Sequence, residues 1–108
     1  MPARLVLDAV HDFAARLRAR FGDRAVWVRL YGSQARGEAH EDSDIDVIAS
    51  VRGLTWREKI DGIDLATDVG LARGLHLSAV ITSDEDFARL VALESSFAEA
   101  VLREGIAA

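Results

Sequence analysis

Two aspartates with the spacing of metal ligands, Asp44 and Asp46, stand at the start of the apolar run 45–49. If this run forms a strand, both carboxylates leave the same face, roughly 7 Å apart along the chain. Such oxygen ligands suit Mg²⁺, which takes one or two protein carboxylates and completes its shell with water and phosphate oxygens. Gly32 and Ser33 come about a dozen residues earlier, where a backbone without Cβ lets a phosphate approach closely. This combination predicts a site for a nucleoside triphosphate and its metal ions.

Strands and helices must hold these residues in place. The segment 25–31 is β-branched and aromatic, which is typical of a strand. We expect the other strands at 44–51 and 75–82, and apolar spacings of three and four residues predict helices at 3–21, 56–73, 84–93 and 95–103. A single helical turn at 33–37, closed by Gly37, and a polar loop at 38–43 join the first two strands. The predicted fold is α/β (α+β), a small mixed three-stranded sheet packed against helices in one domain, 1–108.

Local signals indicate where the second long helix begins and how stable it is. Thr55 and Glu58 have the spacing of a capping box, so this helix should start near Trp56. Gly62 and Gly70 are expected to weaken it by roughly 1 kcal/mol each relative to alanine. Both tryptophans of the chain, Trp56 and Trp27, are most simply interpreted as packing residues.

Composition excludes some classes of protein. The chain has 108 residues, 29% of them charged, and no apolar run approaches the roughly 20 residues of a membrane span. A chain without cysteine has no disulfide framework, and we expect a cytoplasmic protein. The formal charge of −5 argues against a nucleic acid as the main ligand, whereas a metal-bridged nucleotide tolerates an acidic host.

The strongest motif is the run GSQARG at residues 32–37, followed by SDID at residues 43–46. It resembles the signature of the nucleotidyltransferases of the DNA polymerase β superfamily, and most closely the minimal nucleotidyltransferases, which are short single-domain proteins. The order of helices and strands in that group covers essentially the whole chain. The resemblance implies a polymerase β palm-like fold and the transfer of a nucleoside monophosphate, with pyrophosphate as the leaving group.

The resemblance also implies roles for individual residues. Gly32 and Ser33 would hold the triphosphate, and Asp44 and Asp46 would bind two Mg²⁺ ions and carry the catalysis. Arg36 falls on the family's arginine, where it would contact phosphate or brace the acidic loop. A surface ion pair of Arg36 with Glu38 or Glu41 is the alternative interpretation.

One part of the family site is missing from the sequence. The family has a third carboxylate on its third strand, and aligning residues 77–81 with that strand puts Ser78 at its position. A serine hydroxyl is neutral, a poor Mg²⁺ ligand and no base near pH 7. His76, two residues earlier on the same face, is an alternative base.

Three functions therefore remain open. Minimal nucleotidyltransferases commonly act as antitoxins beside a HEPN-domain ribonuclease toxin, so the resemblance implies Mg²⁺-dependent transfer of AMP from ATP to that partner protein. Ser78 favours instead a catalytically degenerate protein that binds and occludes its toxin. Modification of a small molecule, as in aminoglycoside nucleotidyltransferases, is disfavoured because the chain lacks an extra helical domain.

Overall fold

The structure, a computed structural model, describes residues 2–38 and 44–108. Its helices are α1 (Arg4–Phe21), α2 (Gly32–Arg36), α3 (Trp56–Arg73), α4 (Asp84–Ala92) and α5 (Ser96–Glu104), with a 3-10 turn at Gly22–Arg24. The strands are β1 (Ala25–Tyr31), β2 (Ile45–Val51), β3 (Leu77–Ser83) and β4 (Ile106–Ala107). The predicted elements are present with small shifts of their ends, whereas β4 was not predicted. Most of the predicted polar loop, residues 39–43, lies outside the described residues.

The sheet is mixed, as predicted, with the strand order β3-β2-β1-β4. β1 runs antiparallel to both β2 and the two-residue β4, while β2 and β3 are parallel. Parallel neighbours need a long crossover connection, which α3 supplies here. This topology puts β2, the strand that carries Asp46, in the interior of the sheet.

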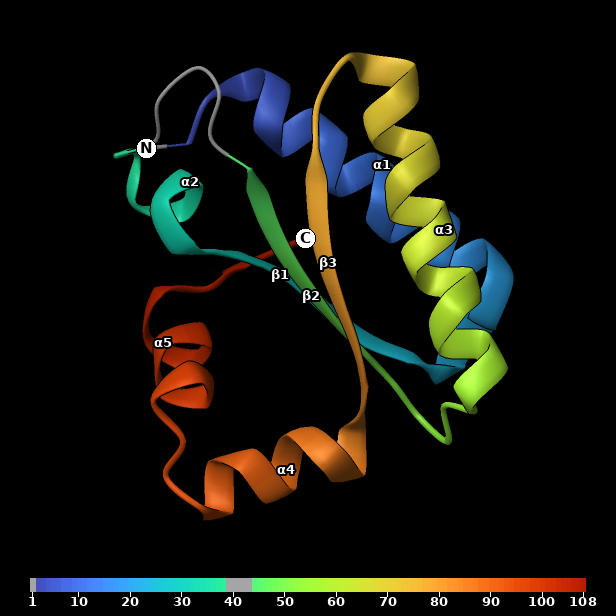
Figure 1. Ribbon diagram of the computed structural model, residues 1–108, viewed down its shortest axis with the longest axis vertical. Coiled ribbons are helices and arrows are strands. Elements are labelled where there is room, and N and C mark those ends of the chain that lie inside the picture. Colours follow the sequence, from blue (N-terminus) through green and yellow to red (C-terminus); the bar gives the residue numbers. More distant parts are fainter. Residues whose placement is uncertain (1, 39–43) are drawn as a thin grey trace.

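Helices cover both faces of the sheet (Figure 1). α1 and α3 lie on one face and α4 and α5 on the other, with α2 at the end of the sheet. The larger core lies under α1 and α3, and its biggest fully buried side chains include Phe13, Leu17, Leu30, Ile45 and Ile81. A smaller cluster under α4 and α5 contains Ile48, Phe87, Ala98 and Val101. Because β2 is covered on both faces, its sequence is almost continuously apolar, and Asp46 interrupts it.

The glycines of α3 do more than weaken the helix. Both are buried, and a Cβ on Gly62 would lie 3.0 Å from Cγ1 of Ile81 in β3. A Cβ on Gly70 would lie 2.5 Å from the backbone oxygen of Leu75, just before β3. The absence of side chains at these two positions therefore lets α3 pack closely against β3 and its approach. No helix among the described residues combines the length and apolar character needed to cross a membrane.

The two tryptophans have different environments. Trp27 packs edge-to-face on Phe87 of α4 with ring centroids 4.8 Å apart, as expected of a packing residue. Trp56 is 76% exposed, so its prediction as a packing residue is wrong. It occupies the first position of α3, after Thr55 and before Glu58, which form the predicted capping box. A large aromatic side chain is thus left in solvent at one end of α3.

Candidate active site

The Gly32–Ser33 turn lies directly against Asp46. β1 ends at Tyr31, and Gly32 begins α2 with a φ of +74°, in the left-handed region that favours glycine. A Cβ at position 32 would lie 2.6 Å from Oδ2 of Asp46. From the sequence, we predicted that this glycine lets a phosphate approach the backbone closely. The structure shows that the missing side chain also makes room for a carboxylate.

Asp46 and Asp44 lie close enough to affect one another. Asp46 is the second residue of β2 and is partly buried, whereas Asp44 immediately precedes the strand and is 57% exposed. Burial raises the pKa of Asp46 above its usual value, and the negative charge of Asp44 raises this pKa further. Two carboxylates with this mutual repulsion would be stabilised by a bound cation.

Tyr31 forms one wall of this region. It is the register partner of Asp46 across β1 and β2, and its ring packs edge-to-face on Phe97 of α5, with centroids 5.5 Å apart. Burial, and then the charge of Asp46, raises the pKa of the Tyr31 hydroxyl. The side chain thus stays neutral near pH 7 and links the end of β1 to α5.

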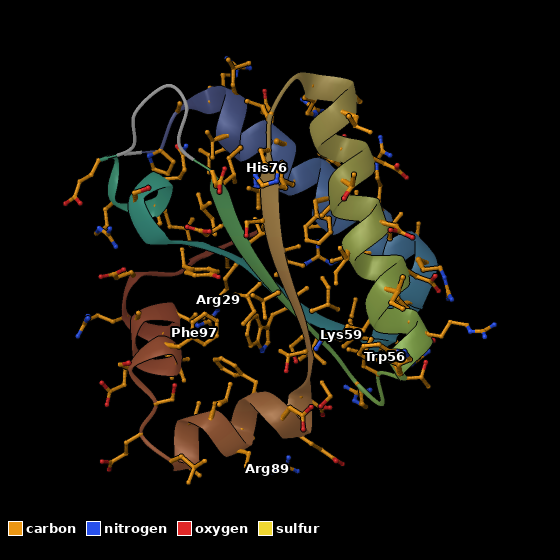
Figure 2. The ribbon with its side chains drawn as sticks, in the orientation of Figure 1. Arg29, Trp56, Lys59, His76, Arg89 and Phe97 are labelled. Atoms are coloured by element: carbon orange, nitrogen blue, oxygen red, sulfur yellow. The ribbon has the colours of Figure 1, made fainter. Side chains whose placement is uncertain are left out.

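Ser78 and His76 flank the two aspartates on β3 and just before it. Ser78 is the register partner of Asp46 between the parallel strands β2 and β3. His76 precedes β3, and its Nδ1 lies 2.8 Å from Oδ1 of Asp44. The backbone oxygen of His76 also accepts a hydrogen bond of 2.9 Å from the N–H of Ile45. The imidazole is 74% exposed, so one of its nitrogens orients Asp44 while the ring remains open to solvent (Figure 2).

Arg36 is engaged by carboxylates. Its Nε donates to Glu38 at 3.0 Å and its Nη1 donates to Glu104 of α5 at 2.9 Å. The structure thus contains the ion pair of Arg36 with Glu38 that the alternative interpretation predicted. Glu41, the other predicted partner, lies outside the described residues. Glu104 was missed as a member of the site. No local pattern in the sequence links Glu104 with Arg36, since the two residues lie 68 positions apart.

The donor set is small. Among the described residues, no group of three or more histidine, cysteine or acidic side chains could hold a metal ion. Asp44 and Asp46 alone are sufficient for Mg²⁺ only if phosphate oxygens and water complete its shell. The hydroxyl of Ser33, at the adjoining turn, makes no hydrogen bond to the described residues and is free for a ligand. The site fits a metal that arrives with a phosphate-bearing molecule.

Comparisons with known proteins show the family to which the chain belongs. Residues 11–101 match the model of the nucleotidyltransferase domain family, and the chain belongs to that family. It is 36% identical over 106 residues to the protein adenylyltransferase MntA of Thermococcus cleftensis, covering 94% of this chain and 95% of that protein.

Solved structures show the same fold. One, provisionally named as a minimal nucleotidyltransferase, superposes with a TM-score of 0.62 at 34% identity and covers 98% of this chain and 95% of its own. Another, described as a toxin-antitoxin with AMP-PNP, has a TM-score of 0.59 at 19% identity and covers 88% of this chain and 68% of that one. The predicted α/β fold and the predicted family are therefore confirmed.

Proposed function

We propose that this chain is a Mg²⁺-dependent nucleotidyltransferase that transfers AMP from ATP to a hydroxyl group of a partner protein. The observation that carries this proposal is the contact of the Gly32 backbone with Asp46, with Asp44 beside it. This contact brings the turn that would bind the phosphates next to the two carboxylates that would bind the metal. Its similarity to a relative named as a protein adenylyltransferase supports AMP as the transferred group.

Asp44 and Asp46 are the residues that would hold the metal. The raised pKa of Asp46, caused by burial and by the charge of Asp44, supports this because a cation between the carboxylates would offset both effects. Bound Mg²⁺ would neutralise charge on the triphosphate and on the oxygens that enter and leave at phosphorus. Most of the catalysis then comes from positioning and charge compensation.

The chain's own residues would bind and orient the nucleotide. Backbone N–H groups of Gly32 and Ser33 and the Ser33 hydroxyl would hold the triphosphate. The acceptor oxygen forms a bond to the α-phosphorus as the bond from that phosphorus to the bridging oxygen breaks, and pyrophosphate leaves. The hydroxyl proton passes to a base, for which His76 beside Asp44 is our candidate.

The partner we propose is a HEPN-domain ribonuclease toxin, with this chain as its antitoxin. Support comes from a fold neighbour described as a toxin-antitoxin with AMP-PNP and from the MntA relative.

A second candidate is a degenerate antitoxin that binds its toxin without modifying it. The observation in its favour is that a neutral residue, Ser78, stands beside Asp46 in the strand register. In that case the carboxylates would bind nucleotide and metal, and neutralisation of the toxin would depend on occlusion alone.

The experiment is incubation of the purified protein with labelled ATP and Mg²⁺, with and without a purified HEPN-domain partner. Label on the partner supports transfer, and toxin neutralisation without label supports occlusion. D44N combined with D46N should abolish labelling. The charge-matched control is D64N combined with D68N, because both of these aspartates are exposed on α3, away from the motif. Labelling that survives D44N and D46N would overturn the proposed site.

A further inference from the structure

β3 is an open edge of the sheet. The strand order β3-β2-β1-β4 leaves no described strand beyond it. The N–H of Ile45 donates to the backbone oxygen of His76, so the alternation of a parallel ladder turns the backbone groups of Ser78, Val80 and Thr82 toward β2. Those of Ala79 and Ile81 therefore point away from the sheet. An open edge of this kind can pair with an extended segment of another chain.

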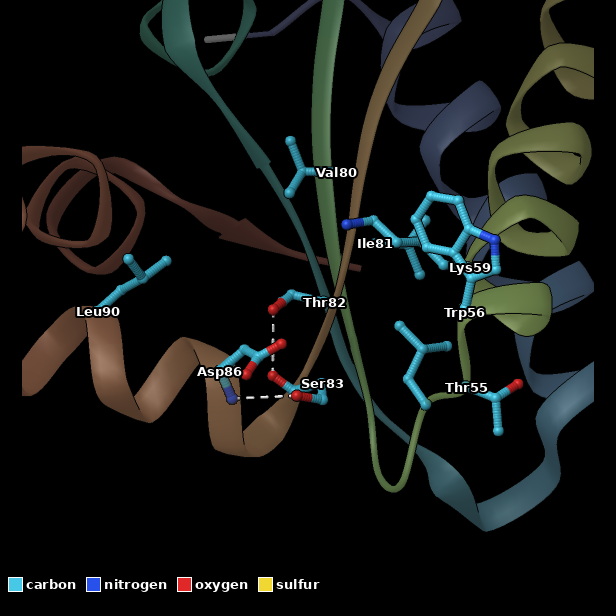
Figure 3. Close-up of a pocket in the computed structure, with 10 residues that line it drawn as sticks. Thr55, Trp56, Lys59, Val80, Ile81, Thr82, Ser83, Asp86 and Leu90 are labelled. Carbon is cyan, nitrogen blue, oxygen red and sulfur yellow. Dashed lines mark hydrogen bonds between the residues drawn. The ribbon is translucent and has the colours of Figure 1, made fainter.

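A groove lies along the second half of this edge. It has a volume of about 370 Å³ and lies between the start of α3 and α4. Trp56 and Lys59 form one wall, Asp86 and Leu90 form the other, and Val80 lies between them (Figure 3). The 76% exposure of Trp56 is explained if this wall receives an apolar side chain from a partner.

The two charged side chains that line the groove differ in whether they have an ion-pair partner. Asp86 is paired with Arg89 at 3.0 Å, whereas Lys59 forms no ion pair with any described residue. Of the two charged side chains that line the groove, Lys59 is therefore the one without an ion-pair partner among the described residues. An occupant that carries a carboxylate next to its apolar side chain would complement both Lys59 and Trp56.

The same strand leads from the groove to the candidate active site. Ser78 is the register partner of Asp46, and His76 contacts Asp44. Thr82 lines the groove, and four residues of strand from Ser78 to Thr82 span roughly 13 Å. The smaller cavity of about 120 Å³ lies on the α3 side of His76 and Leu77. A segment paired with this edge would thus have one end in the groove and the other beside the aspartates.

We propose that the acceptor protein binds as an extended segment on the free edge of β3. Its apolar side chain lies against Trp56 and its carboxylate faces Lys59. Its acceptor hydroxyl lies beside Asp46, roughly four residues from the apolar anchor by strand rise. This inference rests on the proposed transfer to a protein, and it names the surface that selects the acceptor. A second copy of this chain paired edge to edge is the competing occupant.

Amide hydrogen exchange of the complex with the HEPN partner tests the pairing residue by residue. The expected result is that the amides of Ala79 and Ile81, which point outward, gain at least tenfold protection when the partner is added. The amides of Ser78 and Val80 already face β2 and should change much less. Protection of Ala79 and Ile81 that depends on the concentration of this chain alone would show a second copy on the edge and would overturn the proposal.

Labelling kinetics give an independent readout. W56A should raise the KM for the partner about tenfold and leave the KM for ATP unchanged. L93A is the matched control, since Leu93 is 73% exposed but does not line the groove. If the wild type labels no partner, the proposed transfer is wrong, and the exchange experiment still decides whether the edge is occupied. If label is transferred while W56A matches L93A and the outward amides stay unprotected, the acceptor does not dock on β3.

Discussion

Asp46 and Ser78 stand opposite one another as register partners on the parallel strands β2 and β3. This places a hydroxyl directly beside a partly buried carboxylate that already has a raised pKa, caused first by burial and then by Asp44. The strand position at which the resemblance expects a third acid therefore lies on β3, directly beside the strand that carries Asp46.

The first prediction concerns S78D. A third carboxylate at this position should lower the free energy of unfolding by about 1 kcal/mol in the presence of a chelator, because like charges on neighbouring strands repel. Mg²⁺ should then stabilise S78D more than it stabilises the wild type, since binding to the folded state alone adds to stability. Urea denaturation with chelator and with Mg²⁺ measures both effects. An equal gain from Mg²⁺ in both proteins would show that Ser78 does not adjoin a metal site.

The second prediction concerns G32A. A Cβ at this position adds about 1–2 kcal/mol of left-handed backbone strain and meets Oδ2 of Asp46 at 2.6 Å. G53A is the matched control, because Gly53 has a φ of +65° and a Cβ added there would meet nothing within 4 Å.

Both variants should lose stability in thermal denaturation, and G32A should lose more. Only G32A should also lose nucleotide binding, measured by calorimetry with an ATP analogue and Mg²⁺. Equal losses of stability in the two variants would mean that Asp46 moves away without cost.

The third prediction concerns D46N and separates stability from activity. A carboxyl group whose pKa is raised in the folded state favours folding when it is protonated, and this advantage is lost as pH rises through the raised pKa. At neutral pH the ionised Asp46 therefore opposes folding, and D46N should be at least as stable as the wild type in urea denaturation while losing transfer activity. A clear loss of stability in D46N at neutral pH would contradict the stated causes of the pKa shift.

The fourth prediction concerns acid stability. Glu58 accepts two hydrogen bonds from Arg24, at 2.9 and 2.7 Å, and one from the Thr55 N–H at 3.1 Å. These contacts, the Arg24 bonds first, lower the pKa of Glu58 from 4.5 to about 2. The stability they supply is fully present above pH 4.5 and is lost as pH falls toward 2.

In E58Q the unfolding midpoint should therefore be lower than in the wild type at neutral pH and should depend less on pH in that acidic window. A series of thermal melts between neutral and acidic pH measures it. Parallel pH profiles for the two proteins would show that the Arg24 contact does not persist in solution.

Signals that act over a few residues were read correctly from the sequence. Thr55 and Glu58 form their capping box, and Gly37 ends its helical turn in the left-handed conformation. Asp44 and Asp46 also lie close enough for the charge of Asp44 to raise the pKa of Asp46, whereas their position on one face of a strand stays a prediction, because Asp44 precedes β2. These features depend on backbone geometry over three to five residues, which sequence spacing determines directly.

Features that depend on distant parts of the chain were not predictable. A two-residue strand such as β4 has no periodicity to detect, and it exists because β1 offers it an edge. Gly62 and Gly70 lower helix propensity, but they also let α3 pack closely against β3 and its approach, which only the tertiary structure shows. Exposure of Trp56 likewise depends on how α3 lies relative to the edge strand.

The contacts between α2 and α5 connect the Gly32–Ser33 turn to the C-terminal part of the chain. Arg36 reaches Glu104, and Tyr31, just before the turn, packs on Phe97, so two separate contacts link the turn to the same helix. A molecule that displaces α5 would thereby disturb the turn that we propose binds the triphosphate, without touching the nucleotide itself. In the proposed enzyme, α5 would in this way allow control from outside the nucleotide site.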